Sequence, residues 1–143
     1  MTEVTIETLL GGSLITGHSI ENSLDLFEVS RSGLPKKSLL SLIDNLGLTL
    51  RTAAGLLNIT ERTIQRKKDT DLLDQATTEQ ILQIAEIFFR GYEVFGSLDN
   101  FRAWLDIENI SLGGHRPIDL LGSRYGARMV LDTLGRIEQG VFS

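Results

Sequence analysis

The chain has 143 residues, enough for one ordinary domain or for two small domains packed together. Hydrophobic residues make up 41% of it and charged residues 23%, a balance that is typical of a folded, soluble protein. The sequence contains no cysteine, which excludes disulfides, thiolate nucleophiles and iron–sulfur clusters. The first residues are acidic where a secretory signal would be basic, and no apolar run approaches the roughly 18 residues of a membrane span. We therefore expect a soluble, cytoplasmic protein.

Charge is spread unevenly along the chain. The net charge of −5 and the isoelectric point near 5.0 argue against a protein whose whole surface coats nucleic acid. Residues 1–34 contain five carboxylates and a single basic residue, Arg31, whereas residues 48–68 contain five basic residues and a single acidic one, Glu61. This distribution predicts one face that contacts nucleic acid and other faces with different functions.

The hydrophobic periodicity is helical throughout, so we predict an all-α fold. The first twenty residues are ambiguous because Gly11 and Gly12 interrupt a short apolar stretch. A helix is expected over residues 21–32, with Leu24 and Phe27 on its apolar side and Gly33 at its end. Pro35 is then placed as the first residue of a helix that ends at Gly47.

The longest predicted helix covers residues 78–95, and we expect a capping box of Thr77 and Gln80 to open it. The other helices expected in this part of the chain span 50–57, 61–68, 98–106 and 123–138, with N-caps at Thr49, Thr60 and Ser97, a short turn from Pro117 to Leu121, and a stop at Gly140. The polar stretch 69–76 is the predicted connection between two subdomains.

The segment from Leu50 to Lys68 has the anatomy of a helix-turn-helix. Ala53, Ala54 or Gly55 would allow two helices to cross closely, and Asn58 tolerates the left-handed backbone of a tight turn. The second helix would then enter a major groove, with these residues facing the DNA: Thr60, Glu61, Arg62, Thr63, Gln65, Arg66, Lys67 and Lys68. The alternative is an ordinary helical hairpin with a solvated basic face.

An ordered series of residues follows in the C-terminal third: Trp104-Leu105, Asn109, Leu112-Gly113-Gly114, Pro117, Leu120-Leu121, Gly126, Val130, Leu134 and the run from Arg136 to Val141. This series resembles the C-terminal domain of the Xre/MbcA/ParS group of antitoxins, which partner RES-domain toxins. The helix-turn-helix resembles the Xre-like domain of the same group, and the resemblance covers about residues 33–143. We accordingly predict an extension of unknown role (1–32), an Xre-like helix-turn-helix domain (33–92), and a domain for toxin binding and dimerisation (93–143).

The resemblance implies an antitoxin that blocks the active site of an NAD-degrading RES-domain toxin and represses its own operon as a homodimer. We expect that homodimer to form through the apolar surface of the C-terminal subdomain. The toxin-facing residues that it implies lie in the 109–121 loop, the last helix and the tail: Gly113, Gly114, Pro117, Leu120, Leu121, Arg124, Arg128, Arg136, Val141, Phe142 and Ser143. The apolar tail would plug the active site or, alternatively, fold back onto the protein's own core. One face of the last predicted helix carries four charged residues at four-residue spacing: Arg124, Arg128, Asp132 and Arg136. This face would contact a partner or form a solvated row of ion pairs.

Enzymatic functions find little support in the sequence. His18 and His115 are the two histidines, each lies beside glycine, and neither has a second ligand at metal-binding spacing. We therefore expect no catalysis, no metal, no cofactor, no small-molecule substrate and no membrane. The principal alternative is a stand-alone Xre-like repressor whose C-terminal module only dimerises. A more distant one is a structural adaptor with a degenerate helix-turn-helix.

Overall fold

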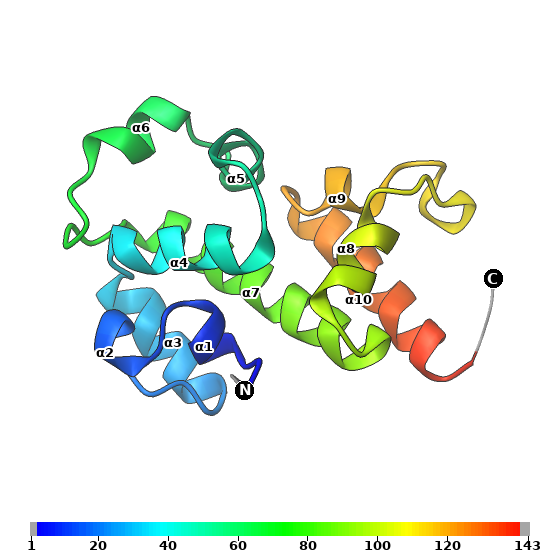
Figure 1. Ribbon diagram of the computed structural model, residues 1–143, viewed down its shortest axis with the longest axis horizontal. Helices are drawn as coiled ribbons and strands as arrows, with labels where there is room; N and C mark the ends of the chain where they lie inside the picture. The colour runs from blue at the N-terminus through cyan, green and yellow to red at the C-terminus, as the bar shows by residue number, and fades with distance from the viewer. Residues whose placement is uncertain (1–2, 141–143) are drawn as a thin grey trace. The chain divides into compact units, whose positions relative to one another are not determined.

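The computed structural model describes residues 3–140, which form helices joined by short connections (Figure 1). Within this range there is no strand, and the extended backbone pairs only in an isolated bridge between Pro35 and Leu72. The all-α prediction is therefore confirmed. None of the described helices is both long and apolar enough to cross a membrane.

The chain divides into two compact units, Met1–Ala85 and Glu86–Ser143, which share one long helix. The first unit contains α1 (Ile6–Leu9), α2 (Ser13–Thr16), α3 (Ser23–Ser32), α4 (Lys36–Leu46), α5 (Leu50–Leu57), α6 (Glu61–Arg66) and the beginning of α7 (Gln75–Phe95). The second unit contains the remainder of α7, α8 (Leu98–Leu105), the 3₁₀ turn η1 (Ile110–Leu112), α9 (Pro117–Leu120) and α10 (Arg124–Glu138).

Local side-chain chemistry sets several helix ends as the sequence predicts. The hydroxyls of Thr49, Thr60 and Ser97 each accept a hydrogen bond from a backbone N–H three residues further on, which satisfies a donor that the helix itself cannot. Gly33 and Gly47 end α3 and α4 with φ of +87° and +64°. Glycine adopts this region without the steric penalty that a side chain imposes.

The start of α7 differs from the prediction. The helix begins at Gln75, so Thr77 lies inside it, and the predicted capping box of Thr77 and Gln80 is wrong. The carboxylate of Asp74 caps the helix instead by accepting from the backbone N–H of Thr77 at 2.8 Å, and this hydrogen bond lowers the pKa of Asp74. The Gln80 side chain donates to the carbonyl of Leu56. Residues 69–76 connect α6 to α7 within the first unit and do not join the two units.

The residues before α3 are tied into the first unit. The side-chain amide of Asn45 in α4 donates to the carbonyls of Thr8 and Leu9, and the backbone N–H of Ile20 donates to the carboxylate of Glu7 at 2.8 Å. Leu9 and the neighbouring Leu10 are buried. The N-terminal helices therefore pack as part of a domain core, and the predicted boundary at residue 32 falls at the end of α3.

The second unit has an aromatic core. Phe88 and Phe101 are fully buried and meet edge to face with ring centroids 5.2 Å apart, while Trp104 stacks on Phe101. The guanidinium of Arg90 in α7 forms a two-pronged ion pair with the carboxylate of Glu138 in α10, with both N···O distances at 2.7 Å. The pairing raises the pKa of Arg90 and lowers that of Glu138.

Replacement of two glycines in α10 by alanine should have opposite effects on the stability of the fold. A Cβ atom added at Gly126 would overlap the backbone carbonyl of Leu120, whereas one added at Gly135 meets nothing within 4 Å. We expect Gly126→Ala to lower the free energy of unfolding by about 1–3 kcal/mol. The new methyl group would meet the backbone of Leu120, which cannot move aside as a flexible side chain can. Gly135→Ala should raise it by up to about 1 kcal/mol, because alanine is the better helix former. Urea unfolding of the two variants measures both changes, and equal effects would contradict the packing described.

Candidate functional site

Helices α5 and α6 and the turn between them form the predicted helix-turn-helix. Asn58 has φ of +57°, and it alone among the described residues other than glycine has a positive φ. Its neighbour Ile59 donates its backbone N–H to the carbonyl of Ala54, which closes the turn. Ala53 and Ala54 are buried, as a close helix crossing requires, but Gly55 is exposed and a Cβ at that position would meet nothing. The crossing is therefore built on the two alanines.

Helix α6 presents a cationic, hydrogen-bonding surface to solvent. Ile64 is the buried residue that anchors it to the first unit, whereas Arg62, Gln65 and Arg66 are exposed. The hydroxyls of Thr60 and Thr63 are hydrogen-bonded to each other at the N-terminus of the helix and remain exposed. Glu61 and Lys67 are half-buried, and Lys68 is exposed. All eight residues predicted to face DNA thus lie on or beside one short helix.

The C-terminal end of α6 is fixed by a contact that the sequence analysis missed. The ammonium of Lys36, at the start of α4, donates to the carbonyl of Lys67 at 2.8 Å. The backbone N–H of Lys68 donates to the carboxylate of Asp71 at the same distance. A cation at a helix C-terminus is also favourable to the helix dipole. No local pattern indicates this partnership, because 31 residues separate the donor from the acceptor.

In the second unit, the Gly113-Gly114 pair shapes a tight loop. The two glycines have φ of +71° and +81°, and the loop is closed by a hydrogen bond from the N–H of Asn109 to the carbonyl of His115. The Asn109 side chain accepts from the N–H of Ser111 and so starts the η1 turn. The glycines are therefore required by the backbone conformation, whatever else contacts this loop.

The residues predicted to face the toxin differ in exposure. Arg124 and Arg128 are exposed, Leu120 and Arg136 are half-buried, and Pro117 and Leu121 are buried in the chain's own core. A side chain that is already buried supports the fold beneath a surface and offers little area to a partner. Val141, Phe142 and Ser143 lie outside the described residues, so the prediction that they plug an active site stays a prediction.

The row of charges along α10 is not a ladder of ion pairs. Among residues 3–140, no ion pair joins Arg124, Arg128, Asp132 or Arg136 to another member of the row. The guanidinium of Arg136 donates to the hydroxyl of Thr133 at 3.2 Å, and its Nε is buried without a hydrogen-bond partner. The exposed charges of Arg124, Arg128 and Asp132 are consequently available to an external partner, whereas Arg136 is partly buried.

Exposed apolar side chains in the second unit were also missed. We call them the apolar surface residues of the second unit: Ile107 (64% exposed), Ile110 (96%), Tyr125 (72%), Met129 (41%) and Leu131 (37%). Tyr125 and Met129 are four residues apart in α10, on a side of the helix that also carries Arg128, and this spacing was a readable signal. Aromatic residues and methionine are enriched in protein interfaces. No cluster of histidine, aspartate and glutamate suited to a metal ion occurs within the described part of the chain.

Two family matches agree with this geometry. Residues 25–86 match the antitoxin Xre-like helix-turn-helix domain, and residues 90–140 match the antitoxin Xre/MbcA/ParS C-terminal toxin-binding domain. No curated protein is similar enough to count as a match. The two matched segments define an antitoxin that combines a DNA-binding fold with a toxin-binding domain. The chain is an antitoxin of the Xre/MbcA/ParS group, as its sequence pattern predicts.

Proposed function

We propose that this antitoxin binds and blocks a RES-domain toxin that degrades NAD⁺, and that it represses its own operon by binding operator DNA through α6. The observation that carries the proposal is the presence, in one chain, of an exposed cationic helix in an Xre-like domain and of exposed apolar and cationic residues in a toxin-binding domain. The resemblance of the C-terminal residue series to antitoxins that partner RES-domain toxins supports the choice of toxin.

At the DNA, Arg62, Gln65 and Arg66 are the proposed base-reading side chains. Arginine donates two hydrogen bonds to the O6 and N7 of guanine, and glutamine pairs similarly with adenine. The remaining proposed contacts are to the phosphate backbone or at the edges of the helix: Thr60, Glu61, Thr63, Lys67 and Lys68. One recognition helix reads few base pairs, so we propose that two copies bind two half-sites about one helical turn apart.

At the toxin, the apolar surface residues of the second unit would supply the buried area of the interface. Burial of a large apolar side chain such as Ile110 contributes about 1.5–3 kcal/mol. Arg124 and Arg128 would add charge-assisted hydrogen bonds to carboxylates of the toxin. A stand-alone repressor could use the same surface for its dimer contact, so the match of residues 90–140 to a toxin-binding domain is what favours the antitoxin over that alternative.

The DNA face is tested by the double variant Arg62→Ala/Arg66→Ala. If both side chains read guanines, each substitution costs about 1–3 kcal/mol of operator binding, and thermal stability changes little because both residues are exposed. Lys67→Ala should instead weaken binding to all sequences alike and lower the salt slope by about one. Fluorescence anisotropy with operator and scrambled duplexes measures both effects. An unchanged operator affinity in the double arginine variant would contradict the assignment.

The toxin-binding surface is tested by Ile110→Asp and by Tyr125→Ala/Met129→Ala. We expect each to weaken inhibition of the toxin's NAD⁺ consumption at least about tenfold, because central apolar anchors carry most of an interface's energy. Leu14→Glu is the matched control, since Leu14 is fully exposed in the first unit. It should leave inhibition unchanged. Full inhibition by both surface variants would show that the toxin binds elsewhere on the chain.

A further inference from the structure

Helix α3 exposes two large apolar side chains to solvent. It buries Val29 and Ser30 against the first unit, while Leu24 and Phe27 on its other side are 63% and 56% exposed. Leu24, Phe27 and Arg31 recur at the three- and four-residue spacing of a single helix face. Leu24 and Phe27 lie on one side of the helix, as their spacing predicts, but no other part of the described chain covers them. We call Leu24, Phe27, Glu28 and Arg31 the α3 face.

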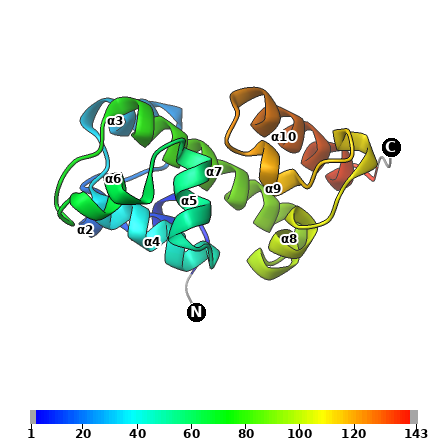
Figure 2. The ribbon, with the colours of Figure 1, turned by 90° about the horizontal axis from the view of Figure 1, so that it is seen from above.

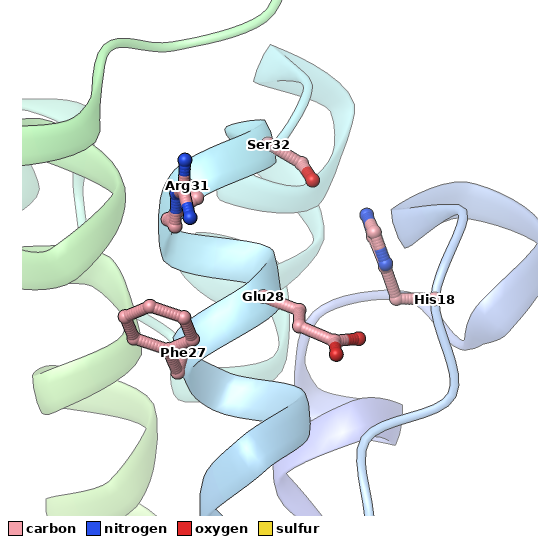
Figure 3. Close-up of a pocket in the computed structure, with 5 residues that line it drawn as sticks. All are labelled: His18, Phe27, Glu28, Arg31 and Ser32. Carbon is pink, nitrogen blue, oxygen red and sulfur yellow. The ribbon is translucent and has the colours of Figure 1, made fainter.

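The charged side chains of the α3 face form no ion pair with the described residues. The guanidinium of Arg31 lies over the ring of Phe27, 5.8 Å from its centroid, while Glu28 points towards the side on which His18 lies (Figure 3). Among residues 3–140, neither Arg31 nor Glu28 nor the exposed Glu21 forms an ion pair. Glu21 lies just before α3 and Arg31 lies in its last turn, so the two residues are at opposite ends of the helix and form no ion pair in one copy.

The surface around these residues is open to a partner. Five residues of α3 and the preceding loop line a hollow of about 540 Å³: His18, Phe27, Glu28, Arg31 and Ser32 (Figure 3). The same N-terminal region carries five carboxylates and one arginine through residue 34, which disfavours nucleic acid and anionic membranes as the partner. A partner must therefore cover an apolar centre and offer both a cation and a carboxylate at the ends.

We propose that the α3 face binds the α3 face of a second copy in an antiparallel, two-fold pair. A two-fold contact uses the same patch twice, so the patch must be self-complementary. If the axis passes between Leu24 and Phe27, Leu24 of one copy packs on Phe27 of the other. Arg31 at the C-terminal end of each helix then lies beside Glu21 at the N-terminal end of its partner. This one arrangement pairs the charges of Arg31 and Glu21 and covers the exposed apolar side chains.

The position of α3 indicates what such a contact would do. In the first unit, α6 lies on one side of α4 and the helices α1–α3 lie on the other (Figure 1); Figure 2 views the same unit along this direction, from the side of α6. Pairing through α3 therefore leaves α6 uncovered and able to contact DNA. A ten-residue helix offers less area than a standard interface, so the contact is weak alone. Because α6 stays uncovered, this contact is compatible with copies that are bound to operator DNA.

Charge reversal by mixing tests the proposal in the full chain. Arg31→Glu and Glu21→Arg each place like charges opposite each other in a two-fold pair, so each variant alone should lose the association step that the wild-type chain shows as its concentration rises. In an equimolar mixture both contacts regain opposite charges, and the step should return. Sedimentation velocity with saturating operator DNA measures it. A variant that merely misfolds cannot be rescued by mixing.

The apolar centre gives a second variant. Leu24→Glu/Phe27→Glu should abolish the association step while leaving operator affinity and toxin inhibition unchanged, and the control Leu14→Glu should leave the step intact. The proposal is overturned if the single charge variants associate as the wild type does, or if their mixture fails to associate. Retained association in Leu24→Glu/Phe27→Glu overturns it as well. None of these outcomes bears on whether α6 binds DNA or the second unit binds toxin.

Discussion

Both units depend on the burial of successive stretches of one helix, α7. Ile81, Ile84 and Ala85 are buried in the first unit, and Ile87 and Phe88 immediately after them are buried in the second. These stretches position functional elements directly. Gln80 of α7 donates to the carbonyl of Leu56 and so holds α5, while Phe88 packs edge to face on Phe101 of α8. A substitution that interrupted α7 would therefore disturb both functions of the antitoxin.

The distribution of charge matches a division of labour between the two family domains. The exposed cations of α6 belong to an otherwise acidic first unit, so in the proposed function the chain contacts DNA through this helix despite its net charge of −5. Lys36 adds a further cation from α4, where it secures the end of α6 through the carbonyl of Lys67. The second unit exposes apolar side chains beside arginines, a combination suited to a protein partner.

Much of the local structure could be predicted because it depends on near neighbours. The caps at Thr49, Thr60 and Ser97 and the left-handed backbone at Asn58 follow from the chemistry of a few consecutive residues. The start of α7 could not be predicted, because Asp74 and Thr77 are both capping residues. The choice between them accompanies a tertiary contact, the burial of Thr78, whose hydroxyl accepts from the N–H of Leu34.

Burial was the least predictable property of the candidate site. Leu121 and Pro117 belong to the residue series that identifies the toxin-binding domain, yet they are buried, whereas Ile110 in the same segment is almost fully exposed. A residue pattern that marks a family combines core and surface positions, and only the packed structure separates them. The same limit applies to α3, where Val29 is buried but Leu24 and Phe27 are exposed.

In the proposed function, one chain silences a toxin and binds DNA through separate surfaces. The most direct measurement is a titration of the purified chain, without DNA, into a purified cognate RES-domain toxin while NAD⁺ consumption is followed. Inhibition should rise in proportion to added chain until it is complete at a fixed ratio of the two proteins. NAD⁺ consumption that continues unchanged at a molar excess of chain would contradict it.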